Sequence, residues 1–259
     1  MAYWQDRLTE TQDKLADKSI KQMEKQLKKY YKQSMKKVIE EFEKTYNKIL
    51  LQIEDGQEPT PALLYKLDTY WSMQAQLKAE AEKLGDKQIK LLSESFETLF
   101  FDVYYSIALE GEMRFSSVSV ETAREMINQI WLLDGKHFKQ RIWGNTNKLV
   151  ETLNEELIHC VLTGKKSDEL KKLLIKRFDV SYSQADMLVR TETAHIQSTA
   201  AHKRYLDAGV SEYEVWASKD ERRCEICGAK HLKRYPIYHP SPVPFHPNCR
   251  CTIIPVIDD

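Results

Sequence analysis

The sequence predicts a mainly α-helical protein with a small α+β part near its C-terminal end. Of its 259 residues, 30% are charged and only 8 are glycine, a composition typical of long exposed helices. No glycine or proline interrupts residues 8–53. After Gly209, apolar and polar residues begin to alternate, which is typical of strands. We therefore expect a long-helix N-terminal bundle, followed by a two- or three-stranded β element packed on helices.

Four helices are predicted in the first half of the sequence. Residues 8–53 carry apolar side chains at three- and four-residue steps, and Asp55-Gly56 ends this helix. Thr60 followed by Pro61 restarts a helix that runs to Leu84, because threonine caps helices and proline suits their first turn. Gly85-Asp86 is expected to end that helix. A third helix then precedes Gly111, and a fourth covers Val120 to Leu133.

Three helices and two strands are predicted in the second half of the sequence. The helices cover residues 148–162, 167–178 and 183–206. A strand over residues 213–217 and a β-branched partner strand over residues 250–257 follow them. We expect two domains, a helical N-terminal region over residues 1–134 and a C-terminal domain over residues 135–259.

Charge and hydropathy limit the class of protein. Lys plus Arg (39) equals Asp plus Glu (39), so no global attraction to nucleic acid follows. No membrane-spanning segment is expected, because no apolar run approaches about 18 residues. The first ten residues are polar where a signal peptide would be apolar. The thiols should therefore stay reduced, which favours metal binding over disulfides.

The first predicted helix is rich in lysine. Two interpretations fit, a phosphate-binding edge for DNA and a solvated helix face. The second is favoured, because no arginine or aromatic stacking platform is interleaved. The lysines are Lys14, Lys18, Lys21, Lys25, Lys28, Lys29, Lys32, Lys36 and Lys37.

Four of the five cysteines lie close to the C-terminal end, together with a histidine. The pairs Cys224/Cys227 and His246/Cys249 each have a two-residue gap, and Cys251 follows. Two such tight turns are typical of a tetrahedral Zn²⁺ site. We favour the first four residues as ligands, although Cys251 could replace either His246 or Cys249. No ligand is obviously missing, so the site is expected to be closed and structural, and its zinc is expected to pin the small sheet against the preceding helices.

Catalytic and transcription-factor-like zinc sites fit less well. A zinc deaminase needs His-x-Glu before its cysteines, and none of the seven histidines has Glu two residues later. A zinc-knuckle nuclease would need a general-base histidine with a partner. His239 is available, but Pro-Ser-Pro follows it. A zinc DNA-binding module would need a recognition helix after the two ligand-bearing turns, which we call the knuckles, but a strand is predicted there. These last two stay as alternatives.

Three motifs in order carry a resemblance to a known family over roughly residues 135–257. They are Arg190-Thr-Glu192, Asp220-x-x-x-Cys224-x-x-Cys227 and His246-Pro-x-Cys249-Arg-Cys251. This region resembles the Mu F-like phage head-morphogenesis family, the minor head or minor capsid proteins.

The resemblance implies a non-enzymatic virion protein that acts in capsid assembly at the portal vertex, with a role in DNA packaging or ejection. It further implies the portal protein and capsid or scaffolding proteins as partners, with packaged double-stranded DNA as a further candidate. The implied location is the head interior at the portal vertex, reached from the host cytoplasm during assembly.

Several further residues are expected to have structural or contact roles. Arg190, Glu192 and Trp216 are expected to be structural, Trp216 by packing beneath the metal site. His195 and His202 are expected to pack rather than to bind metal. A local basic patch is a candidate contact for nucleic acid or the portal, and it comprises Arg222, Arg223, Lys230, Lys233, Arg234 and Arg250.

Overall fold

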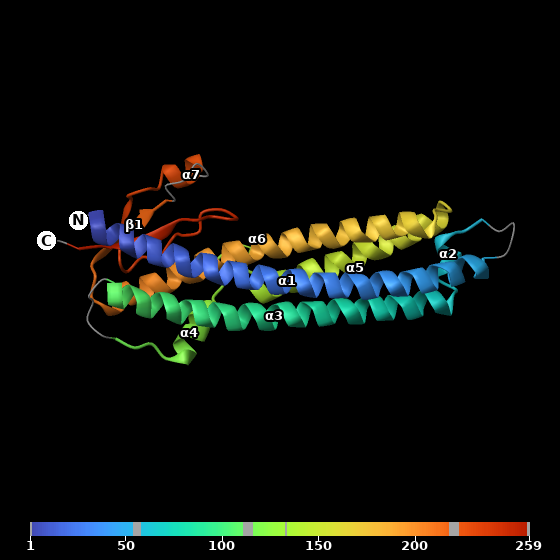
Figure 1. Cartoon of the computed structure of the whole chain (residues 1–259), viewed down its shortest axis with the longest axis horizontal. Coiled ribbons are helices and arrows are strands. Elements are labelled where there is room, and N and C mark those ends of the chain that lie inside the picture. The colour runs from blue at the N-terminus through green and yellow to red at the C-terminus, as the bar shows by residue number, and fades with distance from the viewer. Residues whose placement is uncertain (1, 54–57, 111–115, 133, 218–222, 258–259) are drawn as a thin grey trace. The chain divides into compact units, whose positions relative to one another are not determined.

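The computed structural model describes residues 2–53, 58–110, 116–132, 134–217 and 223–257. Within them, the predicted mainly helical fold with a small C-terminal sheet is confirmed (Figure 1). Among the described residues, no helix is long and apolar enough to cross a bilayer. The elements in chain order are α1 (Ala2–Gln52), α2 (Pro61–Leu64), α3 (Asp68–Glu110), α4 (Val120–Ile127), α5 (Phe138–Leu162), α6 (Ser167–Asp207), β1 (Glu212–Trp216), α7 (Glu225–Gly228), β2 (Arg234–Pro236) and β3 (Thr252–Val256).

The chain forms two compact units whose segments alternate along the sequence. Unit 1 comprises Met1–Glu24, Leu91–Phe138 and Asp186–Asp259. Unit 2 comprises Lys25–Lys90 and Lys139–Ala185. The long helices α1, α3 and α6 each contribute residues to both units.

Unit 2 consists of parts of α1, α3, α5 and α6 that lie side by side, with α2 at one end (Figure 1). The hydroxyl of buried Tyr31 on α1 lies 3.2 Å from the hydroxyl of Ser181 on α6. The hydroxyl of Tyr46, also on α1, donates to the carbonyl oxygen of Cys160 on α5 at 3.1 Å. Burial raises the pKa of Tyr46 to about 12, so this phenol stays neutral and acts as a donor between packed helices.

The helix end expected at Gly85-Asp86 is wrong, because α3 continues through both residues. A Cβ atom at Gly85 would lie 2.8 Å from Cζ3 of Trp143 on α5. The glycine therefore allows the Trp143 ring to approach the α3 backbone closely, and it does not end a helix.

Other expected helix boundaries are also wrong, and α4 ends at Ile127 and not at Leu133, because Asn128 forms its C-cap. Helix α6 runs without a break through residues 179–182, and the Ser183 hydroxyl donates back to the carbonyl oxygen of Asp179 at 2.9 Å. A serine that bonds one turn back lies within a helix, so the two expected helices are one continuous helix. Helix α5 begins at Phe138, ten residues before the expected start at Lys148, and the Phe138 ring packs edge-to-face on Phe96 at 5.3 Å.

The sheet of unit 1 has the order β2-β1-β3, and both pairings are antiparallel. Tyr213 of β1 pairs with Tyr235 of β2, and Val215 of β1 pairs with Ile253 of β3. Four consecutive residues of β1, Tyr213–Trp216, are buried. Both faces of the central strand are therefore covered, although the sequence alternates.

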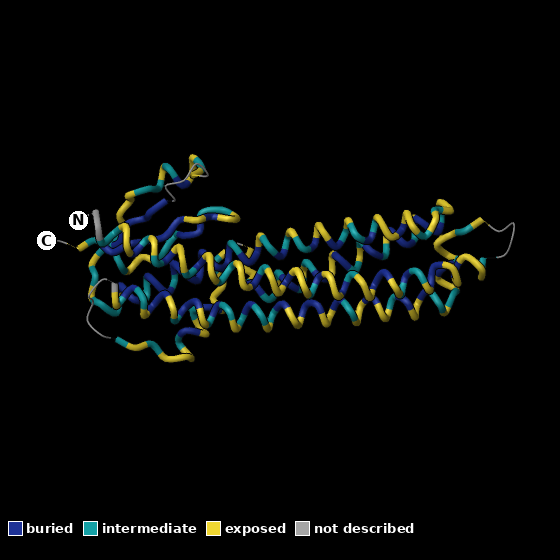
Figure 2. Tube along the Cα trace, in the orientation of Figure 1, coloured by how far each residue is buried: buried dark blue, intermediate teal, exposed yellow. Residues whose placement is uncertain are grey.

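Helix α6 is buried on every side over residues 191–198, within unit 1. Residues 191–198 are all buried, in contrast to the exposed stripes along the helices elsewhere (Figure 2). Gln197 Nε2 donates to Thr252 Oγ1 of β3 at 3.3 Å, and Thr252 Oγ1 donates to Gln12 Oε1 of α1 at 2.6 Å. This short chain of side-chain hydrogen bonds connects α6, β3 and α1.

The close approach at Gly85 can be tested against a matched glycine. Gly85→Ala places a methyl group against the Trp143 ring, and such overpacking costs about 1–3 kcal/mol. Gly144 lies in the interior of α5 with nothing within 4 Å of an added Cβ. Gly144→Ala should therefore stabilise the chain by about 0.5–1 kcal/mol. Thermal unfolding should show a lower Tm for Gly85→Ala and a higher Tm for Gly144→Ala. A rise in both would contradict the close packing.

Candidate metal centre

The first cysteine pair lies on a single short helical turn. Cys224 caps the N-terminus of α7, and its Sγ accepts a hydrogen bond from the backbone N–H of Cys227 at 3.4 Å. The N–H of Gly228 donates to the carbonyl oxygen of Cys224 at 2.8 Å. The turn closes tightly, so the two sulfurs face the same side.

The second pair lies on a loop that is attached to α6. The backbone N–H of Cys249 donates to the carbonyl oxygen of His246 at 3.2 Å. Asn248 between them has φ of 60°, a left-handed conformation in which asparagine is enriched. Its N–H donates to the hydroxyl of Thr191 on α6 at 3.1 Å. The buried part of α6 therefore positions the second turn.

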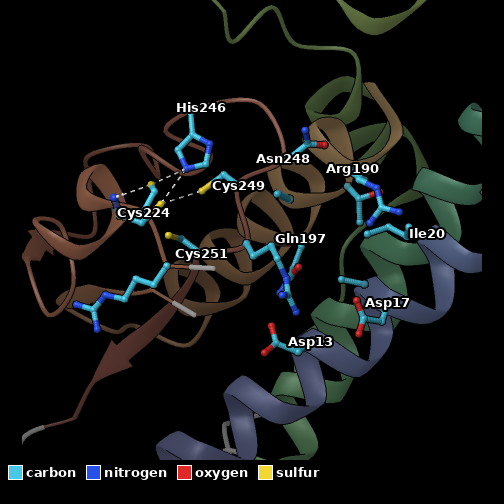
Figure 3. Close-up of a pocket in the computed structure, with 16 residues that line it drawn as sticks. Asp13, Asp17, Ile20, Arg190, Gln197, Cys224, His246, Asn248, Cys249 and Cys251 are labelled. Carbon is cyan, nitrogen blue, oxygen red and sulfur yellow. Dashed lines mark hydrogen bonds between the residues drawn. The ribbon is translucent and has the colours of Figure 1, made fainter. Parts of the chain in front are cut away.

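The structure brings all five candidate ligands together as two overlapping groups of three. Cys224, Cys227 and His246 form one group, and Cys227, Cys249 and Cys251 form the other, with ligand atoms in each group within 4.8 Å of one another. His246 Nε2 lies 3.2 Å from Cys224 Sγ and 3.0 Å from Cys227 Sγ (Figure 3). Cys227 belongs to both groups and lies at the centre of the cluster.

The distances suit a tetrahedral metal site with soft ligands. The sulfurs of Cys227 and Cys249 are 3.7 Å apart, and two thiolates at Zn–S bonds of 2.3 Å in a tetrahedron would be about 3.8 Å apart. His246 Nδ1 lies 2.7 Å from the carbonyl oxygen of Pro247. Because a carbonyl only accepts, Nδ1 carries the proton in the neutral ring, and the lone pair of Nε2 faces the two sulfurs. The cluster could hold a metal ion.

The thiols influence one another strongly. A hydrogen bond from Cys251 lowers the pKa of Cys249 to about 5, whereas burial raises the pKa of Cys227 to about 12. The hydrogen bond with Cys249 raises the pKa of Cys251. One negative charge is therefore accommodated among three crowded sulfurs, and further thiolates would require a cation. Thiolate and imidazole donors favour Zn²⁺ over hard cations such as Mg²⁺ or Ca²⁺.

Arg190 and Glu192 take part in helix packing outside the cluster. Arg190 forms ion pairs with Asp186 on α6 at 3.1 Å and with Glu24 on α1, and its side chain is 42% exposed. Glu192 is buried, and its Oε2 accepts a hydrogen bond from Trp131 Nε1 at 3.1 Å. The Arg-Thr-Glu motif thus directs Arg190 to α1 and Glu192 to Trp131.

Trp216 and the two α6 histidines also lie outside both ligand groups. Trp216 donates from Nε1 to Glu214 at 2.9 Å, and its ring packs edge-on to His231 at 5.8 Å. His195 stacks on Trp131 with ring centroids 4.4 Å apart. His202 Nε2 lies 2.8 Å from the carbonyl oxygen of Ile237.

The candidate basic patch is only partly described. Arg222 lies outside the described residues. Arg223 donates to the carbonyl oxygen of Gly228 at 3.3 Å, and Arg234 lies 3.7 Å from Glu214, which offsets its charge. The remaining members are exposed or half-buried, namely Lys230, Lys233 and Arg250.

A cavity of about 310 Å³ adjoins the cluster, with walls from α1, α6 and the knuckle loops (Figure 3). Asp13 and Asp17 line it from α1, and Thr193 and Gln197 line it from α6. Sequence reasoning missed these residues. The only available signal was the four-residue spacing of the two aspartates, which places them on one helix face but does not indicate what that face meets.

The fold and the cluster define a mainly helical protein whose small sheet lies beside a cysteine-rich candidate metal site. The family described as Phage Mu protein F like protein matches residues 151–254. This match covers α6, most of the sheet and every candidate ligand, so the predicted resemblance to the Mu F-like family is confirmed over these residues. No curated protein and no solved structure matches the chain.

Metal content should depend on Cys227 more than on any cysteine outside the cluster. We expect one zinc ion per chain after dialysis, measured by plasma mass spectrometry. Cys227→Ser should reduce the content to near zero, because both ligand groups use this sulfur. Cys160→Ala is the matched control, since Cys160 is buried in α5 and outside both groups. Equal zinc content in the two variants would contradict the site.

Acid should destabilise unit 1 through His195. Burial lowers its pKa from 6.5 to about 4, so the folded state keeps a neutral ring while the unfolded state binds a proton below about pH 6.5. The contribution of neutral His195 is complete above that pH. This contribution to the free energy of unfolding is lost as the pH falls toward 4, and about 1.4 kcal/mol of it is lost at pH 5.5.

His195→Phe keeps a ring against Trp131 and removes the titration. Urea unfolding at pH 7.5 and pH 5.5 should show a smaller loss of stability in this variant than in the unaltered chain. Any acid release of metal affects both proteins, so the difference between them reports on residue 195. An identical loss would show that His195 is not the titrating group.

Proposed function

We propose that this chain is a non-catalytic minor head protein of a phage, acting in capsid assembly at the portal vertex and in DNA packaging or ejection. The protein would be located in the head interior of the virion, which it would reach during assembly in the host cytoplasm. The portal protein and capsid or scaffolding proteins would be its partners. The single observation that carries the proposal is that the family match spans the whole metal cluster together with α6 and most of the sheet.

We assign the metal as a structural Zn²⁺ held by four of the five candidate ligands. The geometry suits Cys224, Cys227 and His246, with Cys249 or Cys251 as the fourth ligand. Cys249 is favoured because its sulfur lies 3.7 Å from the sulfur of Cys227, which is close to the separation of two thiolates bound to one tetrahedral zinc ion. A bound zinc would fasten α7 and the second turn to α6, and such sites contribute about 10–16 kcal/mol to folding in small zinc peptides.

A structural role is preferred to the alternative of a zinc-knuckle nuclease. Three protein ligands and an open position would be typical of a catalytic zinc, whereas five candidate ligands surround this site. His239 belongs to neither ligand group, and its ring packs against Tyr238 at 4.8 Å. A DNA-binding zinc module is a weaker alternative, because β3 follows the knuckles where a recognition helix would be needed.

We further propose that residues 135–259 act as the head-morphogenesis domain and residues 1–134 as a helical region that supports it. The basic residues Arg222, Arg223, Lys230, Lys233, Arg234 and Arg250 are candidate contacts to the portal or to DNA. Support for this comes from their proximity in sequence to the knuckles and from the family match over residues 151–254.

The proposal predicts a small, fixed number of copies of this chain in each mature particle. Quantitative mass spectrometry of purified heads should give a reproducible handful of copies, with the portal protein counted in the same digest as an internal standard. Heads assembled with Cys227→Ser should contain fewer copies, because the knuckles would not be fastened. Absence of the chain from all heads would reject the virion role, and nuclease assays would then become the first priority.

A further inference from the structure

Five lysines on α1 form a continuous ridge within unit 2, which we define as Lys25, Lys28, Lys29, Lys32 and Lys36. At 100° per residue these positions fall within an arc of about 100°, and they span about 17 Å along the helix. All five side chains are exposed. The ridge is therefore a compact row of positive charge on a chain whose formal net charge is zero.

The ridge lies on the side of α1 opposite to its packed face. Leu27, Tyr31, Ser34 and Val38 are buried, and they fall on the far side of the helical wheel from the lysines. Exposure of the ridge is thus fixed by the packing of unit 2.

The charges of the ridge are largely uncompensated within the described part of the chain. No ion pair is found there for Lys25, Lys28, Lys29 or Lys32, and Lys36 has only an exposed contact with Glu40 at 3.8 Å. A helix face that serves solubility commonly alternates sign at four-residue steps, as Glu10 and Lys14 do on the same helix. Like charges at three- and four-residue steps instead destabilise a helix slightly. A bound polyanion would remove that cost.

The composition of the ridge indicates what kind of polyanion fits. On sequence alone, the lack of interleaved arginine and aromatic residues favoured a solvated face, but this lack argues against base contacts and base stacking and not against contacts to phosphates. Met35, at the edge of the ridge, is half-buried, so the ridge has no exposed apolar anchor of the kind that protein interfaces use. A row of flexible point charges suits the regularly spaced phosphates of a duplex, without sequence preference.

We propose that this ridge binds the phosphate backbone of double-stranded DNA, independently of sequence. The contact goes beyond the proposed head role and does not depend on it, because it is a property of the purified chain. It also differs from the basic residues near the knuckles, which belong to unit 1.

The test is the salt dependence of binding to a labelled 30-base-pair duplex, measured by fluorescence anisotropy with the full chain. The ridge variant is Lys25→Gln/Lys28→Gln/Lys29→Gln/Lys32→Gln. The control variant is Lys48→Gln/Lys66→Gln/Lys78→Gln/Lys172→Gln, which removes the same charge from scattered exposed positions of unit 2. Circular dichroism and Tm establish that both variants fold.

Each phosphate contact contributes about −0.9 to the slope of log affinity against log salt. Four contacts therefore contribute about −3.6, equivalent to about a 150-fold loss of affinity between 50 and 200 mM salt. The ridge variant should lose this part of the slope, whereas the control variant should lose less than about one-quarter of it. Two duplexes of different sequence should behave alike.

Equal slopes for the ridge and control variants would overturn the proposal, as would a failure of the unaltered chain to bind the duplex. A labelled polyglutamate of matched charge separates DNA from an acidic protein. Loss of polyglutamate binding without loss of duplex binding in the ridge variant would identify an acidic protein surface and would also overturn the proposal. None of these results alters the copy number in heads, so failure of the ridge and failure of the head role are distinguishable.

Discussion

The packing of unit 1 depends on hydrogen bonds between a few buried polar side chains. Thr252, Gln12 and Gln197 are all buried, and each bonds to another member of the set. Gln12 Nε2 and the Tyr205 hydroxyl both reach the carbonyl oxygen of Ile253, at 3.3 and 3.0 Å. A buried polar group without its partner costs about 1–3 kcal/mol, so α1, α6 and β3 must be in register together. The same arrangement holds Thr191 where it positions the second knuckle turn.

The sequence was sufficient to predict the type of most elements, and it failed where a residue's role depends on a distant neighbour. Apolar periodicity predicted the helices because each carries a regular buried stripe. Gly85 was misread as a helix end, since its role is set by Trp143 on another helix. The short strand β2 had no clear signal, because its three residues take their conformation from pairing with β1.

The sequence was sufficient to predict which residues gather at the candidate site, because the spacing of ligands is a local property. The two-residue gaps bring Cys224, Cys227, His246 and Cys249 together on two turns, and Cys251 lies next to them. Spacing also favoured Cys249 over Cys251, whereas the distances that support this preference join turns that are 22 residues apart and come only from the fold. The acidic wall formed by Asp13 and Asp17 could not be predicted either, because α1 meets the knuckles only through the tertiary fold.

The hydrogen bonds of Gln12 have a consequence for how the chain is made. Their partners, Thr252 and Ile253, lie 240 and 241 residues further along. Translation proceeds from the N-terminus, so α1 leaves the ribosome long before β3 exists. During that interval its apolar stripe and the Gln12 amide lack their native partners in unit 1. Closure of unit 1 is therefore a late, non-local event that carries a large loop-closure entropy. Until then, a chaperone or a temporary neighbour would be needed to cover the nascent N-terminal helix.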